Sequence, residues 1–153
     1  MLHWFRNKAE DFFSIKDKQI IVAAIKKAET MTSGEVRVFI ESKCSYVQAI
    51  DRAIELFDKL DMHKTEDRNG VLVYVALKHR QLAIYADEGI YQKVGTNYWK
   101  NQLHNMIQHF RKDDYAQGIA NVVLEIGEAL KQHFPYDDRG DVNELNDEIV
   151  FGN

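Results

Sequence analysis

The stretch Val71-Leu72-Val73-Tyr74-Val75-Ala76-Leu77 decides the fold, because it is apolar at every position. A strand without alternation of polar and apolar residues is typical of a sheet that helices cover on both faces. We therefore expect residues 71–77 to be the central strand. His79-Arg80 offers a short connection to a second strand at residues 81–86, so the two strands are expected to form an antiparallel hairpin.

A third strand is predicted before the central one, since residues 35–40 alternate with a period of two. One face has Val36, Val38 and Ile40, and the other has Glu35, Arg37 and Phe39. Between these strands, a helix capped by Ser45 is expected to pack through Ala49, Ile50, Ala53, Ile54, Phe57 and Leu60. A right-handed crossover through this helix makes the two strands parallel.

Three more helices follow from apolar residues at helical spacing. One is capped by Ser14 and ends before Gly34, one is capped by Thr96 or Asn97, and one runs from near Asp114 to Pro135. The pattern predicts a small α/β domain with a mixed sheet.

Composition favours one domain. The chain has 153 residues, of which 45% are hydrophobic, and no Pro/Gly-rich linker divides it. We expect one domain at residues 1–134 and an acidic tail at 135–153, which carries a net charge of −5 against −4 for the whole chain. The tail lacks the calcium-loop spacing of an EF-hand. It is either an ordinary C-terminus or a segment that covers a groove or recruits a partner.

The overall charge and the single cysteine argue against several functional classes of protein. An acidic chain with scattered lysines and arginines is a poor ligand for nucleic acid, and Cys44 alone forms no intramolecular disulfide. We find neither a signal peptide nor a transmembrane segment, so we expect a monomeric cytoplasmic protein whose partner is another protein. Histidine spacing does not favour zinc, and no established nucleophile or phosphate-loop motif occurs.

Acidic residues are expected to gather at one edge of the sheet. The first two strands start there and the hairpin returns there, so Glu66, Asp67, Asp87 and Glu88 become neighbours, with Glu35 as a further candidate. Clustered carboxylates favour a hard divalent cation such as Ca²⁺ or Mg²⁺. The simpler alternative is a solvated acidic surface that Arg68, Lys64 or Lys93 neutralises.

Asp113 and Asp114 have a simple structural explanation as caps of the last helix. A strict up-and-down path places them on the edge opposite Asp87.

Four phrases, in their order and spacing, resemble the TPM domain family from about Phe12 to Phe134. They are Gly34-Glu35-Val36-Arg37-Val38, Asp67-Arg68-Asn69-Gly70-Val71-Leu72, the turn ending at Gly89, and Arg111-Lys112-Asp113-Asp114-Tyr115-Ala116-Gln117-Gly118. The chain departs from the family at Tyr85-Ala86-Asp87-Glu88-Gly89, where many relatives have a Gly-x-Gly turn. Most relatives also have a signal peptide and a membrane anchor.

The resemblance implies a three-layer αβα sandwich and divalent-cation binding by loop carboxylates. The residues that it implies as ligands are Asp67, Asp87 and Glu88, together with Glu66, Asp113 and Asp114. For plant relatives it also implies an acid phosphatase activity. The leading hypothesis is a soluble, non-catalytic Ca²⁺- or Mg²⁺-binding module that recognises another protein. The alternative is a weak metal-dependent acid phosphatase.

Overall fold

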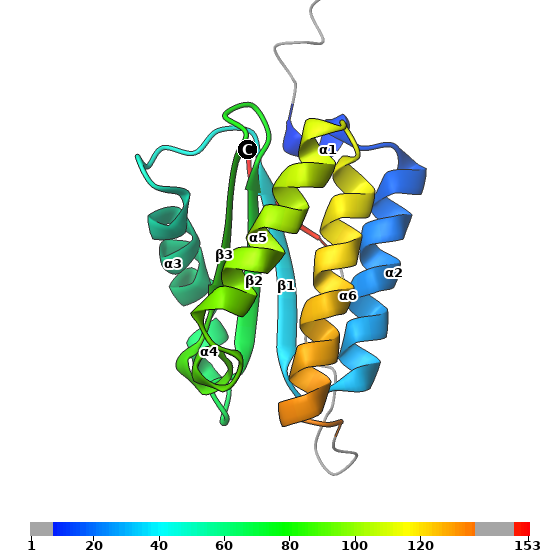
Figure 1. Ribbon diagram of the computed structural model, residues 1–153. Helices are drawn as coiled ribbons and strands as arrows, with labels where there is room; N and C mark the ends of the chain where they lie inside the picture. The colour runs from blue at the N-terminus through cyan, green and yellow to red at the C-terminus, as the bar shows by residue number, and fades with distance from the viewer. Residues whose placement is uncertain (1–7, 137–148) are drawn as a thin grey trace, which may run out of the picture.

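A computed structural model of the protein describes residues 8–136 and 149–153. Its sheet has the strand order β3-β2-β1-β4 (Figure 1). The strands are β1 (Glu35–Glu41), β2 (Gly70–Ala76), β3 (Gln81–Ala86) and β4 (Val150–Phe151). β1 is parallel to β2 and to β4, whereas β2 and β3 are antiparallel. The predicted parallel pair and the predicted hairpin are both confirmed.

Helices cover both faces of this sheet. They are α1 (Ala9–Phe12), α2 (Ile15–Met31), α3 (Ala49–Lys59), the short 3-10 helix η2 (Met62–Lys64), α4 (Glu88–Val94), α5 (Thr96–Arg111) and α6 (Tyr115–His133). α2, α5 and α6 contribute to the core on one face, and α3 packs on the other (Figure 1). The structure confirms the three-layer αβα sandwich with a mixed sheet.

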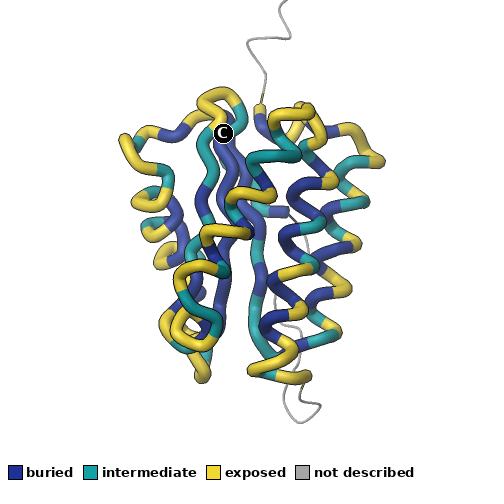
Figure 2. The backbone as a smooth tube through the Cα atoms, in the orientation of Figure 1, coloured by how far each residue is buried: buried dark blue, intermediate teal, exposed yellow. Residues whose placement is uncertain are grey.

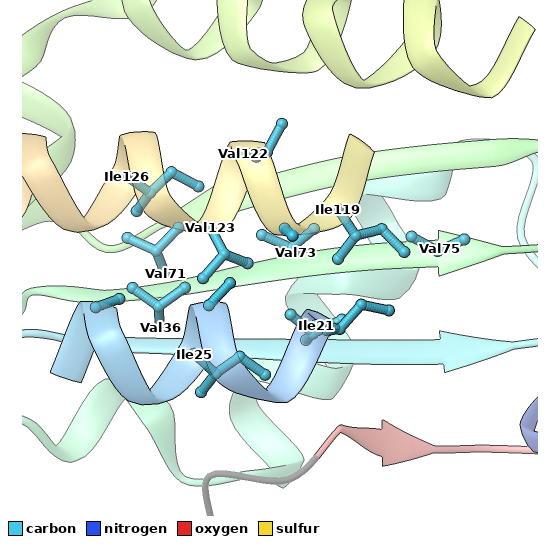
Figure 3. Close-up of a cluster of buried hydrophobic side chains, with 14 of the residues drawn as sticks. Ile21, Ile25, Val36, Val71, Val73, Val75, Ile119, Val122, Val123 and Ile126 are labelled. Atoms are coloured by element: carbon cyan, nitrogen blue, oxygen red, sulfur yellow. The ribbon is translucent and has the colours of Figure 1, made fainter. Parts of the chain in front are cut away.

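β2 is the central strand, and all seven of its residues are buried. Val71, Val73 and Val75 contact the core formed by α2 and α6 (Figure 3). Leu72, Tyr74 and Ala76 belong to the core beneath α3. Figure 2 shows the strand as a buried band between exposed helix surfaces. The lack of alternation in its sequence therefore reflects two apolar layers.

Local signals placed α2 and β1 correctly. The Ser14 side chain accepts a hydrogen bond of 3.0 Å from the Asp17 N–H group, as expected of an N-cap. In β1, Val36 and Val38 face the α2 and α6 side, and Phe39 faces the α3 side. The period-two pattern thus assigned both faces of this strand.

The prediction for α3 was wrong in two respects. The helix begins at Ala49 with Gln48 at the N-cap position, so Ser45 is not its cap. Ile50 and Ile54 are 38% and 44% exposed, and Leu56 is buried instead. α3 covers β2 and β3 with one narrow stripe, and a second stripe of apolar residues remains on its outer side.

The strand β4 was not predicted. The Gly152 N–H group donates a hydrogen bond of 2.9 Å to the Ile40 carbonyl, which extends the sheet beyond β1. The end of the expected tail therefore belongs to the domain, whereas its acidic residues at 137–148 lie outside the described residues. In the part of the chain that the structure describes, no helix combines the length and apolarity needed to cross a membrane.

Candidate functional site

The loop at residues 65–69 and the start of α4 meet at one edge of the sheet. β1 and β2 both start at this edge, with Glu35 and Gly70 as register partners. The Asp87 N–H group donates a hydrogen bond of 2.9 Å to the Gly70 carbonyl, which places the end of β3 beside the start of β2. The predicted convergence of the loop with Asp87 and Glu88 is present in the structure. We call this region the loop–helix junction.

Asp87 is the N-cap of α4, a helix that the sequence analysis missed. Its Oδ1 accepts a hydrogen bond of 2.8 Å from the Glu88 N–H group. Because only Ile90 of this seven-residue helix is buried, apolar periodicity gave little signal. An aspartate followed at once by a glutamate was the available sign of a helix start.

Arg68 holds the junction together. Its Nε and Nη2 donate hydrogen bonds of 2.7 and 2.8 Å to the two carboxylate oxygens of Asp87. Its Nη1 lies 3.2 Å from Glu88 Oε1. These contacts, with the hydrogen bonds to Asp87 as the largest cause, raise the pKa of Arg68 above its ordinary value. The Asp87 residue is only 1% exposed, so its charge is neutralised by a bidentate partner in the way that a buried carboxylate requires.

The loop backbone packs closely on α4 at Gly89. The Gly89 N–H group donates a hydrogen bond of 2.8 Å to the Arg68 carbonyl. A Cβ atom on Gly89 would lie 2.0 Å from the Asp67 carbonyl oxygen, so only glycine fits there. On the other side of the loop, the Asn69 N–H group donates to Thr65 Oγ1 at 3.1 Å. The loop is therefore fixed at several points, and this contact explains why Gly89 follows the acidic pair.

Glu35 lies at the same edge but has a separate environment. Burial raises the pKa of its carboxyl group to about 7, and Arg37 opposes this shift. The Arg37 Nε lies 3.9 Å from Glu35 Oε1 and has no hydrogen-bond partner among the described residues. Glu35 is thus a partly buried carboxyl group that is only loosely paired with its neighbour.

Asp113 and Asp114 lie at the opposite end of the sheet, in the connection between α5 and α6 (Figure 1). Asp114 Oδ2 is 2.9 Å from His109 Nδ1, and Asp113 accepts a hydrogen bond of 3.1 Å from the Tyr115 hydroxyl. Asp114 occupies the N-cap position of α6 without a side-chain cap, so the capping explanation was wrong. The six acidic residues do not form one cluster, because α5 runs from one end of the sheet to the other.

The junction has the right chemistry for a hard cation but not the placement. Carboxylate and carbonyl oxygens are the ligands that Ca²⁺ and Mg²⁺ prefer. In the described part of the chain, however, no group of three or more His, Cys, Asp or Glu side chains is arranged to hold a metal ion. Arg68 occupies both oxygens of Asp87, as the simpler alternative expected, while Lys64 contacts Asp61 at 3.3 Å. With Arg68 bound to Asp87, these residues therefore do not form a metal site.

A second polar cluster is buried under α3 at the other end of β1. Arg52 donates hydrogen bonds of 2.9 and 3.0 Å to the Glu41 carboxylate, which also accepts one from the Tyr74 hydroxyl. Burial and this contact raise the pKa of Tyr74. The Arg52 guanidinium lies 5.9 Å from the centre of the Phe39 ring. Each member is paired, so the cluster reads as structural.

The fold and the loop–helix junction define a small αβα domain closed by an arginine–aspartate pair. Residues 7–129 match the model of the TPM domain, and the chain belongs to the TPM domain family. It is similar to the NMR structure of the BA42 protein from the psychrophilic bacterium Bizionia argentinensis, with 34% identity and a TM-score of 0.81. That match covers 91% of this chain and 94% of BA42. No curated protein matches the chain significantly.

Proposed function

We propose that this TPM domain is a non-catalytic module that binds Ca²⁺ or Mg²⁺ at the loop–helix junction and recognises another protein. The observation that supports it is the Arg68–Asp87 pair. Four carboxylate side chains, those of Glu66, Asp67, Asp87 and Glu88, belong to this short region, and one guanidinium supplies the positive charge at its buried member.

The pair suggests competition between Arg68 and a cation. Asp87 is enclosed, whereas the Arg68 side chain is 44% exposed and can leave towards solvent. Once Arg68 has left, Asp87, Glu88 and Asp67 would be the residues available to the cation, and Glu66 would add charge from the loop. Asp113 and Asp114 stand apart at the other end of the sheet, so any contribution from them would be a separate site.

An amide-resolved NMR titration with CaCl₂ and with MgCl₂ tests this competition. Arg68→Gln is expected to bind the cation about tenfold more tightly than the wild type, because it removes the competing charge. Asp87→Asn is expected to lose the saturable shifts. Arg80→Gln is the matched control, since Arg80 shares the positive φ of Arg68 but lies in the β2–β3 hairpin. Cation affinity that does not rise in Arg68→Gln would overturn the proposal.

Weak metal-dependent acid phosphatase activity is the second candidate. The exposed guanidinium of Arg68 beside several carboxylates favours it, because guanidinium groups bind phosphoryl oxygens well. Magnesium-dependent hydrolysis of p-nitrophenyl phosphate, abolished in Asp67→Asn and Asp87→Asn, would support this candidate. Turnover no faster than that of the free cation would exclude it.

A further inference from the structure

An open groove of about 480 Å³ lies between α5 and α6. Most of its polar lining consists of amide side chains, namely Gln102, Asn105 and Gln108 from α5 and Asn121 from α6. His109 lines one end, and Glu125 lies towards the other, where its carbonyl accepts a hydrogen bond from Tyr98. This groove is separate from the loop–helix junction.

Gln102 is the unexpected member of this set. It is 6% exposed and occupies the core-facing stripe of α5 between Trp99 and Met106, where an apolar residue is the rule. Its Oε1 is buried and has no hydrogen-bond partner among the described residues. A buried acceptor without a partner raises the free energy of the ligand-free protein. A ligand that donates an N–H or O–H group to this oxygen would remove that cost.

The neighbouring side chains are held in place by one another. His109 Nδ1 lies 2.9 Å from Asp114 Oδ2, so in the neutral ring Nδ1 donates and Nε2 is left as the acceptor. Asn121 Nδ2 lies 3.4 Å from that Nε2, and Asn121 Oδ1 accepts a hydrogen bond of 2.8 Å from Gln117. This chain of contacts fixes the orientation of the Asn121 amide at the groove.

The lining limits the class of ligand. Among the described residues that line the groove, none is a lysine or an arginine, and the His109 imidazole is the one aromatic ring. Phosphate groups would find no lysine or arginine, and bases or sugar rings would have to stack on a ring that Asp114 and Asn121 already contact at its two nitrogens. A carboxamide offers a donor and an acceptor side by side, which matches the N–H and C=O groups of a peptide main chain. Leu124 adds apolar surface for a small side chain.

We propose that the groove between α5 and α6 binds an extended peptide segment of the partner protein through main-chain hydrogen bonds to Gln102, Asn105 and Asn121. The inference rests on the protein-recognition part of the proposed function. Gln102 and His109 are two helical turns apart, about 10 Å, which matches about three residues of extended chain. The Glu125 carboxylate favours a basic side chain at its end of the segment and disfavours an acidic one.

The probe is a displayed library of random heptapeptides, selected on the full chain in the presence of EDTA. EDTA removes any bound cation, so the selection does not depend on cation binding at the loop–helix junction. Absence of peptide binding at the groove can therefore be distinguished from absence of cation binding at the junction. Enriched peptides are then synthesised and titrated into labelled protein. We expect shifts of the side-chain amide signals of Gln102, Asn105 and Asn121, and about a tenfold loss of affinity in Gln102→Met and in Asn105→Ala.

Gln132→Met is the matched control, because Gln132 is an exposed amide beyond the groove near the end of α6. It should bind the peptides as the wild type does. Gln102→Met should also raise Tm by about 3 °C, since it removes an unpaired buried acceptor, so loss of binding would not reflect loss of the fold. Asn105 is exposed, and its replacement keeps the test valid if the Gln102 variant does not fold.

Three outcomes would overturn the inference. The first is a selection that enriches no peptide on the wild type beyond its yield on Gln102→Met. The second is a set of peptides whose shifts lie outside the groove. Shifts of the same amide signals by methyl glucoside, without a peptide that binds, would replace the peptide with a polyol ligand and also overturn it.

Discussion

Arg68 and Asp87 form a bidentate pair between a loop and the first residue before a helix, with N–O distances of 2.7 and 2.8 Å. The same carboxylate caps α4 through the Glu88 N–H group. One buried residue therefore joins three segments: its backbone N–H group binds Gly70 at the start of β2, and its carboxylate binds Arg68 in the loop and the Glu88 N–H group at the start of α4. The loop–helix junction depends on this carboxylate more than on the other acidic residues, which are more exposed.

Asp87→Asn is expected to destabilise the protein by about 2 kcal/mol, because the amide has one acceptor oxygen and loses one of the two hydrogen bonds from Arg68, which keeps Glu88 as its charged partner. The measurement is the free energy of unfolding in urea. Asp67→Asn serves as the control, since Asp67 is exposed and should change stability by less than about 0.5 kcal/mol. Equal losses in the two variants would contradict a special role for Asp87.

Gly89→Ala is expected to displace the loop at residues 65–69, because the new Cβ would collide with the Asp67 carbonyl. The cost should be about 3 kcal/mol. Amide hydrogen exchange at Asn69 should speed up. Gly95→Ala is the comparison, since Gly95 has a φ of 83° with no atom near its Cβ position. It should lose stability through backbone strain alone and leave Asn69 protected.

Glu35 should make stability fall as pH rises. Its pKa is about 7 in the folded protein against 4.5 for the free group, because burial disfavours the charged form. Between these values the folded state keeps a proton that the unfolded state has lost, so the free energy of unfolding decreases by up to about 3 kcal/mol. Below pH 4.5 the stabilisation is complete, and above pH 7 it is lost.

Urea titrations of Glu35→Gln across pH 4 to 8 check this expectation. The variant should lose the decline and become more stable than the wild type at pH 8. Glu10→Gln, at an exposed position in α1, should keep the wild-type profile. A Glu35→Gln profile that still falls with pH would assign the effect to another group.

The cluster under α3 should behave as a coupled unit. Tyr74→Phe is expected to cost about 1 kcal/mol, because it removes one donor to Glu41. Glu41→Gln should cost about 2 kcal/mol, since Arg52 loses the charge of one of its two carboxylate partners and keeps Glu55. A double-mutant cycle in urea should give a coupling energy of about 1 kcal/mol between the two positions. Additive losses would show that the hydroxyl and the carboxylate act independently.

The sequence predicted the regular part of the fold because its signals are local. Seven apolar residues marked the buried strand, alternation assigned the faces of β1, and Ser14 marked the start of α2. The parallel pair followed from the handedness of crossovers, which is almost invariant. Those rules depend on neighbours in the chain, so no knowledge of distant contacts was needed.

The short elements β4 and α4, and the face of α3 that packs on the sheet, were not predicted correctly. β4 has two residues, which is too few for a period, and the seven-residue α4 buries only one side chain. For α3, the sequence could not show which of two apolar stripes faces the sheet, and Ile54 lies on the exposed one. Gln102 gave a usable sign, since a polar residue interrupts the apolar stripe of α5.

The sequence by itself determined that this chain folds as a small mixed α/β domain and that acidic residues from separate phrases reach one edge of its sheet. Only the tertiary structure decided which charges pair. Arg68 takes Asp87 and Glu88, whereas Asp113 and Asp114 lie at the far end beside His109. The reason is physical: backbone periodicity is set by adjacent residues, but a side chain's partner depends on packing between segments that are far apart in the chain.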